Sequence, residues 1–137
     1  MNFVFTIQYK LRIPAMNDKK SWIIISAVSG FTAVAIGAFG AHGLQEKLTS
    51  EMLEVYKTGV LYHLIHSVVL LVLSLNTLIK AKLPSIFILL GIILFSFSLY
   101  IYSISGIKIF AMITPIGGFC FLVGWLLIIY EAVKVNE

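Results

Sequence analysis

The chain alternates between long apolar runs and short polar gaps, and four of the runs have the length of a membrane span. They cover residues 21–41, 58–79, 84–104 and 109–130, and none of them contains Asp, Glu, Lys or Arg. About 20 apolar residues of helix cross a hydrocarbon core of about 30 Å. Continuous apolar runs favour helices over a β-barrel, whose strands alternate polar and apolar residues. The pattern therefore predicts an all-α membrane protein with four transmembrane helices.

The composition also indicates a membrane protein, and the short polar gaps indicate a single domain. Of the 137 residues, 60% are hydrophobic and 12% are charged, whereas soluble domains carry about 25% charged residues. The polar gaps are short, so consecutive helices must run antiparallel beside one another. We expect one up-and-down four-helix bundle over residues 21–131, preceded by an N-terminal cytoplasmic segment, residues 1–20.

Positive residues are divided unevenly between the two predicted membrane sides. Because cytoplasmic loops carry the excess of Lys and Arg, we predict that both termini are cytoplasmic. The net charge of +4 fits this orientation and anionic headgroups better than nucleic acid. The richer side carries Lys10, Arg12, Lys19, Lys20, Lys80, Lys82 and Lys134, and the poorer side carries Lys47, Lys57 and Lys108.

Residues 1–15 are too few and too basic to span the bilayer. Met16 directly precedes the polar stretch NDKKSW, which is typical of the start of a first span. We expect translation to begin at Met16, with residues 1–15 as an upstream extension. A short interfacial segment and a cleaved signal peptide are the alternatives.

Two helix boundaries can be predicted from local chemistry. Thr49 or Ser50 can cap a second helix that begins near residue 50 and runs to about residue 79. In the fourth span, Thr114 and Pro115 interrupt the apolar run, and a proline inside a helix removes an amide donor. We predict a kinked helix from about residue 109, because a start at Pro115 leaves too short a span.

Small residues recur at helical spacing and are predicted to pack helices. In lipid, small residues four positions apart let helix backbones approach closely. The alternative is that they leave a cavity for a ligand. The predicted packing set is Gly30, Ala33, Gly37, Gly40, Ala41, Gly59, Gly117, Gly118 and Gly124.

Polar side chains form one stripe on the second span and another on the third. Polar residues in membrane helices usually face the bundle interior, so we expect these stripes to meet the small-residue seams of the first and fourth helices. The stripes are Tyr56, Gly59, His63, His66, Ser67, Ser74 and Thr77 on the second span, and Ser96, Tyr100 and Ser103 on the third.

The candidate ligand site consists of His42, Tyr62, His63, His66 and Tyr100. We expect all three histidines near the outer membrane boundary. We predict that His42 and His66 lie within about 10 Å of each other, the spacing of two packed helices. Structural hydrogen bonds are the first interpretation, and a metal or haem site, a pH sensor or a small-ligand site are the alternatives. Trp22 and Trp125 are expected in the interfacial aromatic belts.

The sequence carries none of the common catalytic motifs. A phosphate-binding glycine loop, a catalytic triad and a dinucleotide fingerprint are all missing, and no carboxylate lies within a predicted span. We therefore expect no enzymatic activity, no cofactor, no bound metal and no nucleic-acid partner. The expected partners are the lipid bilayer and either further copies of the chain or another membrane protein.

Four segments resemble one family in sequence and in order. They are GAFGAHGL at 37–44, YKTGVLYHLIHSVVLL at 56–71, FSFSLYIYSISG at 95–106 and TPIGGFCFLVGW at 114–125. Together they are similar to domain of unknown function 423, which includes bacterial UPF0382 proteins and the eukaryotic transmembrane protein 256. The resemblance covers about residues 20–131 and implies a four-span fold with no assigned activity. It also implies glutamine more often at His63 and glycine more often at Phe97, which weakens a metal site that needs His63.

Three functions remain open on the sequence. We expect a non-enzymatic accessory or partner-binding bundle in the plasma membrane, because the chain is small, rich in packing seams and without a catalytic set. The first alternative is an oligomeric transporter or channel for a small solute or ion, built around the histidine and tyrosine stripe. The second is a quinone- or metal-binding enzyme subunit that uses His42 and His66.

Overall fold

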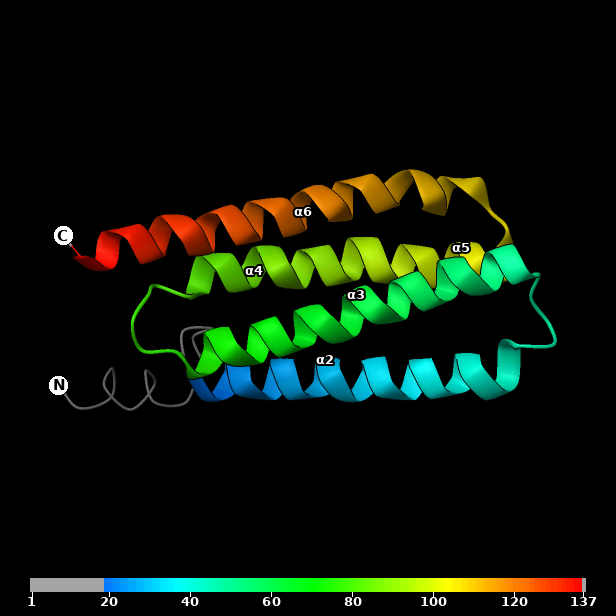
Figure 1. The fold of residues 1–137 in the computed structure, drawn as a ribbon, viewed down its shortest axis with the longest axis horizontal. Helices are drawn as coiled ribbons and strands as arrows, with labels where there is room; N and C mark the ends of the chain where they lie inside the picture. The colour runs from blue at the N-terminus through cyan, green and yellow to red at the C-terminus, as the bar shows by residue number, and fades with distance from the viewer. Residues whose placement is uncertain (1–18, 137) are drawn as a thin grey trace, which may run out of the picture.

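A computed structural model describes residues 19–136, and these residues are almost entirely helical (Figure 1). The first span is α2, Lys19–Phe39, which continues into a π-helical turn, η1, Gly40–Leu44. The second is α3, Ser50–Leu75. The third consists of α4, Lys82–Gly91, a π-helical turn η2, Ile92–Ser96, and α5, Phe97–Ser105. The fourth is α6, Lys108–Val133, followed by a short 3₁₀ turn η3, Lys134–Asn136.

The up-and-down architecture predicted from the sequence is confirmed. Four candidate spans, residues 19–44, 50–75, 82–105 and 108–133, are long and apolar enough to cross a membrane. The start of α2, the loop between α3 and α4 and the end of α6 lie at the same end of the bundle (Figure 1). The placement of that end in the cytoplasm stays a prediction, as does the division into residues 1–20 and 21–131. The proposed extension, residues 1–15, lies outside the described residues.

The bundle is open, because close backbone contacts join only consecutive spans. Within residues 19–136, α2 packs against α3, α3 against α4 and α5, and these two against α6. In Figure 1 the spans follow one another across the molecule in that order. The two outer spans therefore bury a smaller share of their residues than the two inner ones. One side of α2 and one side of α6 are left to the lipid.

The helix ends have identifiable causes. Thr49 caps α3 as predicted, because its hydroxyl accepts a hydrogen bond from the amide of Met52 at 3.2 Å. The prediction that α3 runs to residue 79 is wrong. Asn76 ends the helix, since its side-chain oxygen accepts from the amides of Leu78 and Ile79 while its amide group donates to two carbonyls. Gly106, with φ of 69°, ends α5 in the left-handed conformation that favours glycine.

Pro115 lies inside α6, as predicted, and the helix begins at Lys108. The hydroxyl of Thr114 donates to the carbonyl of Phe110 at 3.2 Å and lies 2.8 Å from the hydroxyl of Ser98 on α5. These contacts anchor the α6 backbone immediately before the proline to the neighbouring span. The kink itself stays a prediction.

Glycines allow close backbone approach at two of the helix interfaces. A Cβ at Gly40 would overlap the ring of Tyr56, and a Cβ at Gly117 would overlap the backbone of Phe95. Such overlap explains why only glycine fits these positions. Ala33, Gly59 and Gly124 are buried as expected, Gly30, Gly37 and Gly118 are packed less tightly or only partly buried, and Ala41 is exposed.

The core consists of two apolar clusters with a polar layer between them. One cluster lies near the start of α2 and contains Trp22, Leu70, Leu73, Ile88, Ile92 and Phe121. Trp22 is therefore a core residue, and its place at the level of an interfacial aromatic belt stays a prediction. The other cluster lies toward the opposite end and contains Leu44, Tyr56 and Tyr100. Between them, His63 and Ser67 of α3 meet Ser29 of α2, and Ser67 lies beside Gly30, so the stripe of the second span meets the first helix as expected. The same expectation is wrong for the third span, because Tyr100 contacts α3, and Gly117 and Gly124 of α6 face Phe95 and Ile88.

Replacement of Gly117 by alanine should separate α6 from the third span. The added Cβ would press on the Phe95 backbone, which cannot rotate away as a side chain can. We expect a loss of about 1–3 kcal/mol in the free energy of unfolding, measured by denaturation with sodium dodecyl sulfate. The matched control is Gly118→Ala, whose Cβ would lie 3.8 Å from the Phe95 ring. Equal losses in the two variants would contradict the packing role of Gly117.

Candidate functional site

The polar layer is built around His63 near the middle of α3. Its Nε2 lies 3.2 Å from the hydroxyl of Ser29, and its Nδ1 lies 3.2 Å from the hydroxyl of Tyr100. The hydroxyls of Ser29 and Ser67 are 2.6 Å apart, and Ser67 donates to the carbonyl of His63 at 2.7 Å. We call Ser29, His63, Ser67 and Tyr100 the His63 cluster. Its members come from three spans and are all buried.

The direction of each hydrogen bond in the His63 cluster can be deduced. The hydroxyl of Ser67 donates its proton to the carbonyl of His63, so Ser29 must donate to Ser67. Ser29 then has no proton left, so the Nε2 of His63 must carry one and donate to Ser29. The Nδ1 of His63 is left as an acceptor for the hydroxyl of Tyr100. A neutral imidazole satisfies every partner, and the chain of bonds closes on the carbonyl of His63 itself.

His66 forms a second, aromatic cluster on the side that faces α6. Its Nδ1 donates to the carbonyl of Tyr62 at 2.8 Å, which leaves Nε2 to accept from the indole of Trp125 at 3.4 Å. Its ring stacks on Phe121 with centroids 3.7 Å apart. We call Tyr62, His66, Phe121 and Trp125 the His66 cluster. Trp125 is therefore an interhelical hydrogen-bond donor, which its expected place in an aromatic belt did not indicate.

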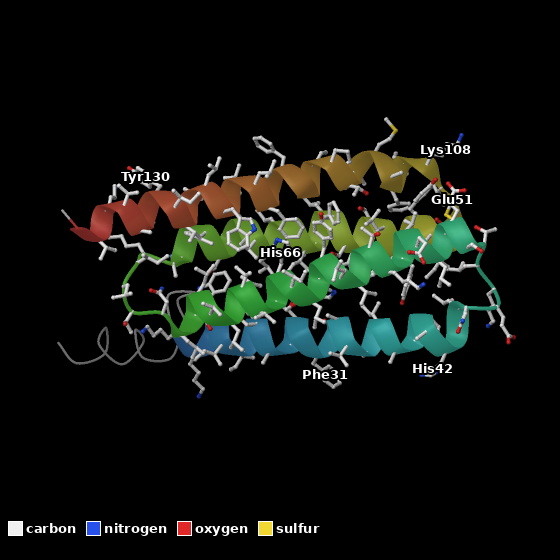
Figure 2. The ribbon with its side chains drawn as sticks, viewed as in Figure 1. Phe31, His42, Glu51, His66, Lys108 and Tyr130 are labelled. Carbon is white, nitrogen blue, oxygen red and sulfur yellow. The ribbon has the colours of Figure 1, made fainter. Side chains whose placement is uncertain are left out.

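The prediction of one site shared by His42 and His66 is wrong. Gly30 of α2 lies beside Ser67, so His66 is nearly level with residue 30, and His42 is about 18 Å farther along the helix axis. Figure 2 shows His42 near the far end of α2 and His66 at mid-length between the spans. In the π turn η1, Gly40 and Leu44 face inward, which turns His42 outward.

The expectation that all histidines lie near one boundary is also wrong. His63 and His66 are about 20 and 24 Å from the start of α3, a helix of about 39 Å. They contact different spans, and their ring nitrogens are engaged separately. Within residues 19–136, no three His, Cys, Asp or Glu side chains come together in a way that could hold a metal ion.

Within residues 19–136, the hydroxyl oxygen of Ser96 is the one side-chain polar atom that is fully shielded from solvent and has no hydrogen-bond partner. Serines in membrane helices commonly donate to the carbonyl four residues earlier. For Ser96 that carbonyl belongs to Ile92, and in the π turn η2 it accepts a hydrogen bond from the amide of Phe97. The unpaired hydroxyl thus lies at a π turn, a local geometry that the residue pattern did not indicate.

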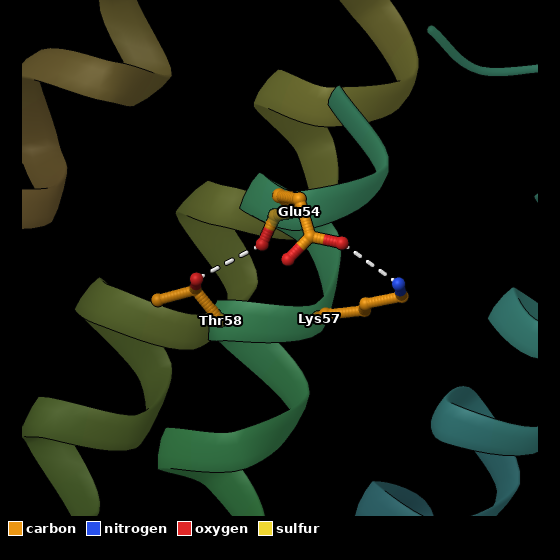
Figure 3. A network of polar contacts seen from close by, with 3 residues as sticks. All are labelled: Glu54, Lys57 and Thr58. Carbon is orange, nitrogen blue, oxygen red and sulfur yellow. Dashed lines mark hydrogen bonds and ion pairs between the residues drawn. The ribbon is translucent and has the colours of Figure 1, made fainter. Parts of the chain in front are cut away.

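A groove of about 660 Å³ opens between α2 and α3 at the end opposite to the start of α2. Gly37 of α2, Ala41 of η1 and Gln45, which follows η1, form one side, and Leu61 and Leu64 lie on its α3 side. Polar groups gather at its outer end. There Lys57 pairs with Glu54 at 2.7 Å, and the hydroxyl of Thr58 donates to the carbonyl of Glu54 at 2.9 Å (Figure 3). The groove is apolar along its length and polar only at this end.

Comparisons with known proteins identify relatives along most of the chain. Residues 36–118 match a family described as a protein of unknown function, DUF423. The UPF0382 membrane protein YwdK of Bacillus subtilis is 41% identical over 120 residues, which covers 84% of this chain and 98% of the relative. The UPF0382 inner membrane protein YgdD of Escherichia coli is 36% identical over 119 residues, covering 84% and 91%. No solved structure matches the chain.

Two buried serines should respond in opposite ways to replacement by alanine. Ser29→Ala leaves the Nε2 proton of His63 without an acceptor, and we expect a loss of about 1 kcal/mol or more in the free energy of unfolding. Ser96→Ala removes a hydroxyl that bonds to nothing, so we expect no loss or a small gain. Denaturation in detergent compares the two, and a larger loss for Ser96→Ala would refute the hydrogen-bond assignment.

Proposed function

This chain belongs to the DUF423 family of UPF0382 membrane proteins, and we propose that it acts as a non-enzymatic subunit that binds a helix of a partner membrane protein. The observation that carries the proposal is the groove between α2 and α3. The multi-pass membrane location is supported by four apolar spans and by membrane relatives. We further propose the plasma membrane as its location.

The shape and chemistry of the groove suit a transmembrane helix. Gly37 and Ala41 of the first span, and Gln45 immediately after it, are spaced four residues apart and all line the groove. Small residues at this spacing let a second backbone approach closely in lipid. Leu61 and Leu64 supply apolar contacts on the opposite wall. At the outer end, Thr58 and the Glu54–Lys57 pair offer polar groups to residues that flank a partner's span.

The buried polar clusters support a structural role for the histidines. In the His63 cluster every ring nitrogen already has a partner, and the bonds close on themselves. In the His66 cluster one nitrogen donates to a backbone carbonyl and the other accepts from an indole. A general base or metal ligand needs a lone pair that is free to act. This arrangement favours hydrogen bonding between helices over chemistry on a substrate.

Transport is supported less well by this geometry. The His63 cluster occupies about one turn of α3. A relay for ions or protons must instead extend across the bilayer. Around it lie the two apolar clusters of the core. A transport path would therefore have to run between copies of the chain and not through a single bundle.

Filling the groove should weaken partner binding without unfolding the protein. Ala41 is exposed and lines the groove, so Ala41→Leu adds bulk where a partner helix would pack. We expect about a tenfold loss of affinity, which corresponds to about 1.4 kcal/mol of unfavourable packing. Quantitative mass spectrometry of the protein purified in mild detergent would measure the amount of partner retained per chain.

The matched control is Ala38→Leu, because Ala38 is also exposed on α2 but lies outside the groove. The proposal requires that this variant retain the partner at the wild-type ratio. Equal retention by both variants would refute the groove as the binding surface. A retained partner that proves to be a second copy of this chain would replace the hetero-partner with a homo-oligomer.

A further inference from the structure

A second pocket, of about 360 Å³, lies at the opposite end of the bundle from the α2–α3 groove. It is bounded by the start of α2, the end of α3 and the start of α4, which meet at one end of the molecule (Figure 1). Trp22 and Leu73 form part of its apolar wall, and Ser74 and Ser85 contribute hydroxyls. Neither the histidine clusters nor the proposed partner-binding surface includes it.

The charged residues of this pocket are all of one sign. Lys19 comes from α2, Lys80 from the loop after α3, and Lys82 from the first turn of α4, and the part of the lining that lies within residues 19–136 includes no Asp or Glu. Three separate segments thus bring ammonium groups to one opening. The loop is fixed by the hydrogen bonds of Asn76 to residues 78 and 79, which places Lys80 and Lys82 on the same side as Lys19. Such a concentration of cations favours an anionic ligand.

The start of α4 adds a second feature that favours an anion. Ala81 is the N-cap, and no side chain caps the helix. Helix N-termini present backbone amides and the positive end of the helix dipole, which together attract phosphate and carboxylate groups. The third span continues from this turn to Ser105, so the dipole is that of a long helix.

Ser85 provides an independent sign of a ligand. It is 2% exposed and lines the pocket, and its hydroxyl forms no hydrogen bond with any part of residues 19–136. Other buried serines of the bundle, such as Ser26 and Ser67, donate to the carbonyl four residues earlier. A buried hydroxyl needs a partner, since leaving it unpaired costs free energy. The pocket is the place from which that partner can come.

We propose that this pocket binds a phosphate group, with the headgroup of an anionic phospholipid as its source. The three lysines neutralise the phosphate, while the hydroxyl of Ser85 and the amides of Lys82 and Leu83, the free amides in the first turn of α4, donate hydrogen bonds to its oxygens. Leu78 and Leu83, beside the pocket in the chain, are 78% and 52% exposed and give the acyl chains an apolar surface. Basic pockets between helix ends are a recognised form of headgroup site.

Native mass spectrometry of the full-length, delipidated protein in an uncharged detergent tests the proposal. Phosphatidylglycerol and phosphatidylcholine are titrated separately, and we expect one phosphatidylglycerol to bind in preference. The variant Lys19→Gln, Lys80→Gln, Lys82→Gln should lose about a hundredfold in affinity, at about fivefold for each lysine. Ser85→Ala should lose several-fold, and it changes no charge, so it remains informative if the triple variant fails to fold.

The control variant removes the three lysines at the other end, Lys47→Gln, Lys57→Gln and Lys108→Gln, and should bind phosphatidylglycerol with wild-type affinity. If inorganic phosphate displaces phosphatidylglycerol, the phosphate of the headgroup is the group that the pocket recognises. Binding of inorganic phosphate without binding of either lipid would overturn the lipid source and assign the pocket to a soluble phosphate. Equal losses in the two triple variants, or wild-type affinity in Ser85→Ala and in the pocket triple variant, would overturn the site.

Discussion

The structure depends on the absence of water inside the bilayer, because a buried polar group is then stabilised only by a partner within the bundle. The His63 cluster meets this requirement with four groups from three spans, and each proton has one acceptor. At the end of the first span, where the π turn begins, the hydroxyl of Tyr56 supplies a hydrogen bond to the carbonyl of Ile36. These bonds fix the rotation of α2 and α5 about α3 more specifically than apolar packing alone can.

Close packing then completes what the hydrogen bonds orient. The ring of Tyr56 packs closely against Gly40, and the ring of Tyr100 packs closely against Gly59. The backbone of Phe95 packs closely against Gly117. The same rings belong to the polar layer or to the cluster beside it. The interhelical hydrogen bonds of these tyrosines thus depend on the small residues against which their rings pack. A tyrosine can reach its partner across the interface only because the facing residue has no side chain.

The sequence predicted the spans, their order and most of the buried faces, because these depend on periodicity. The polar faces of the second and third spans are buried as predicted, apart from Thr77, which lies beyond the end of α3. The sequence did not predict the two π turns, because a π turn inserts a residue without changing the apolar pattern. His42, which faces outward, and Ser96, whose hydroxyl has no partner, both lie in these turns.

The site was harder to predict than the fold for a related reason. A helical wheel places His63 and His66 on one side of α3, and they are indeed both buried, yet each meets a different neighbouring span. Which neighbour a residue meets depends on the order of helices in space. Ser29 and Trp125 were missed as partners because they lie 34 and 59 residues away from the histidines that they bond. Only a three-dimensional arrangement relates positions so distant in the chain.

The consecutive packing of the spans has a consequence for how the protein is assembled. Each span packs mainly against the one made just before it, so it can find its neighbour as soon as it enters the membrane. When segments that are near one another in the chain make contact, the loop between them is short, and its closure costs little conformational entropy. The fourth span is the exception, since Trp125 and Phe121 reach back to His66. The fourth span therefore adds contacts to two of the spans that precede it in the chain.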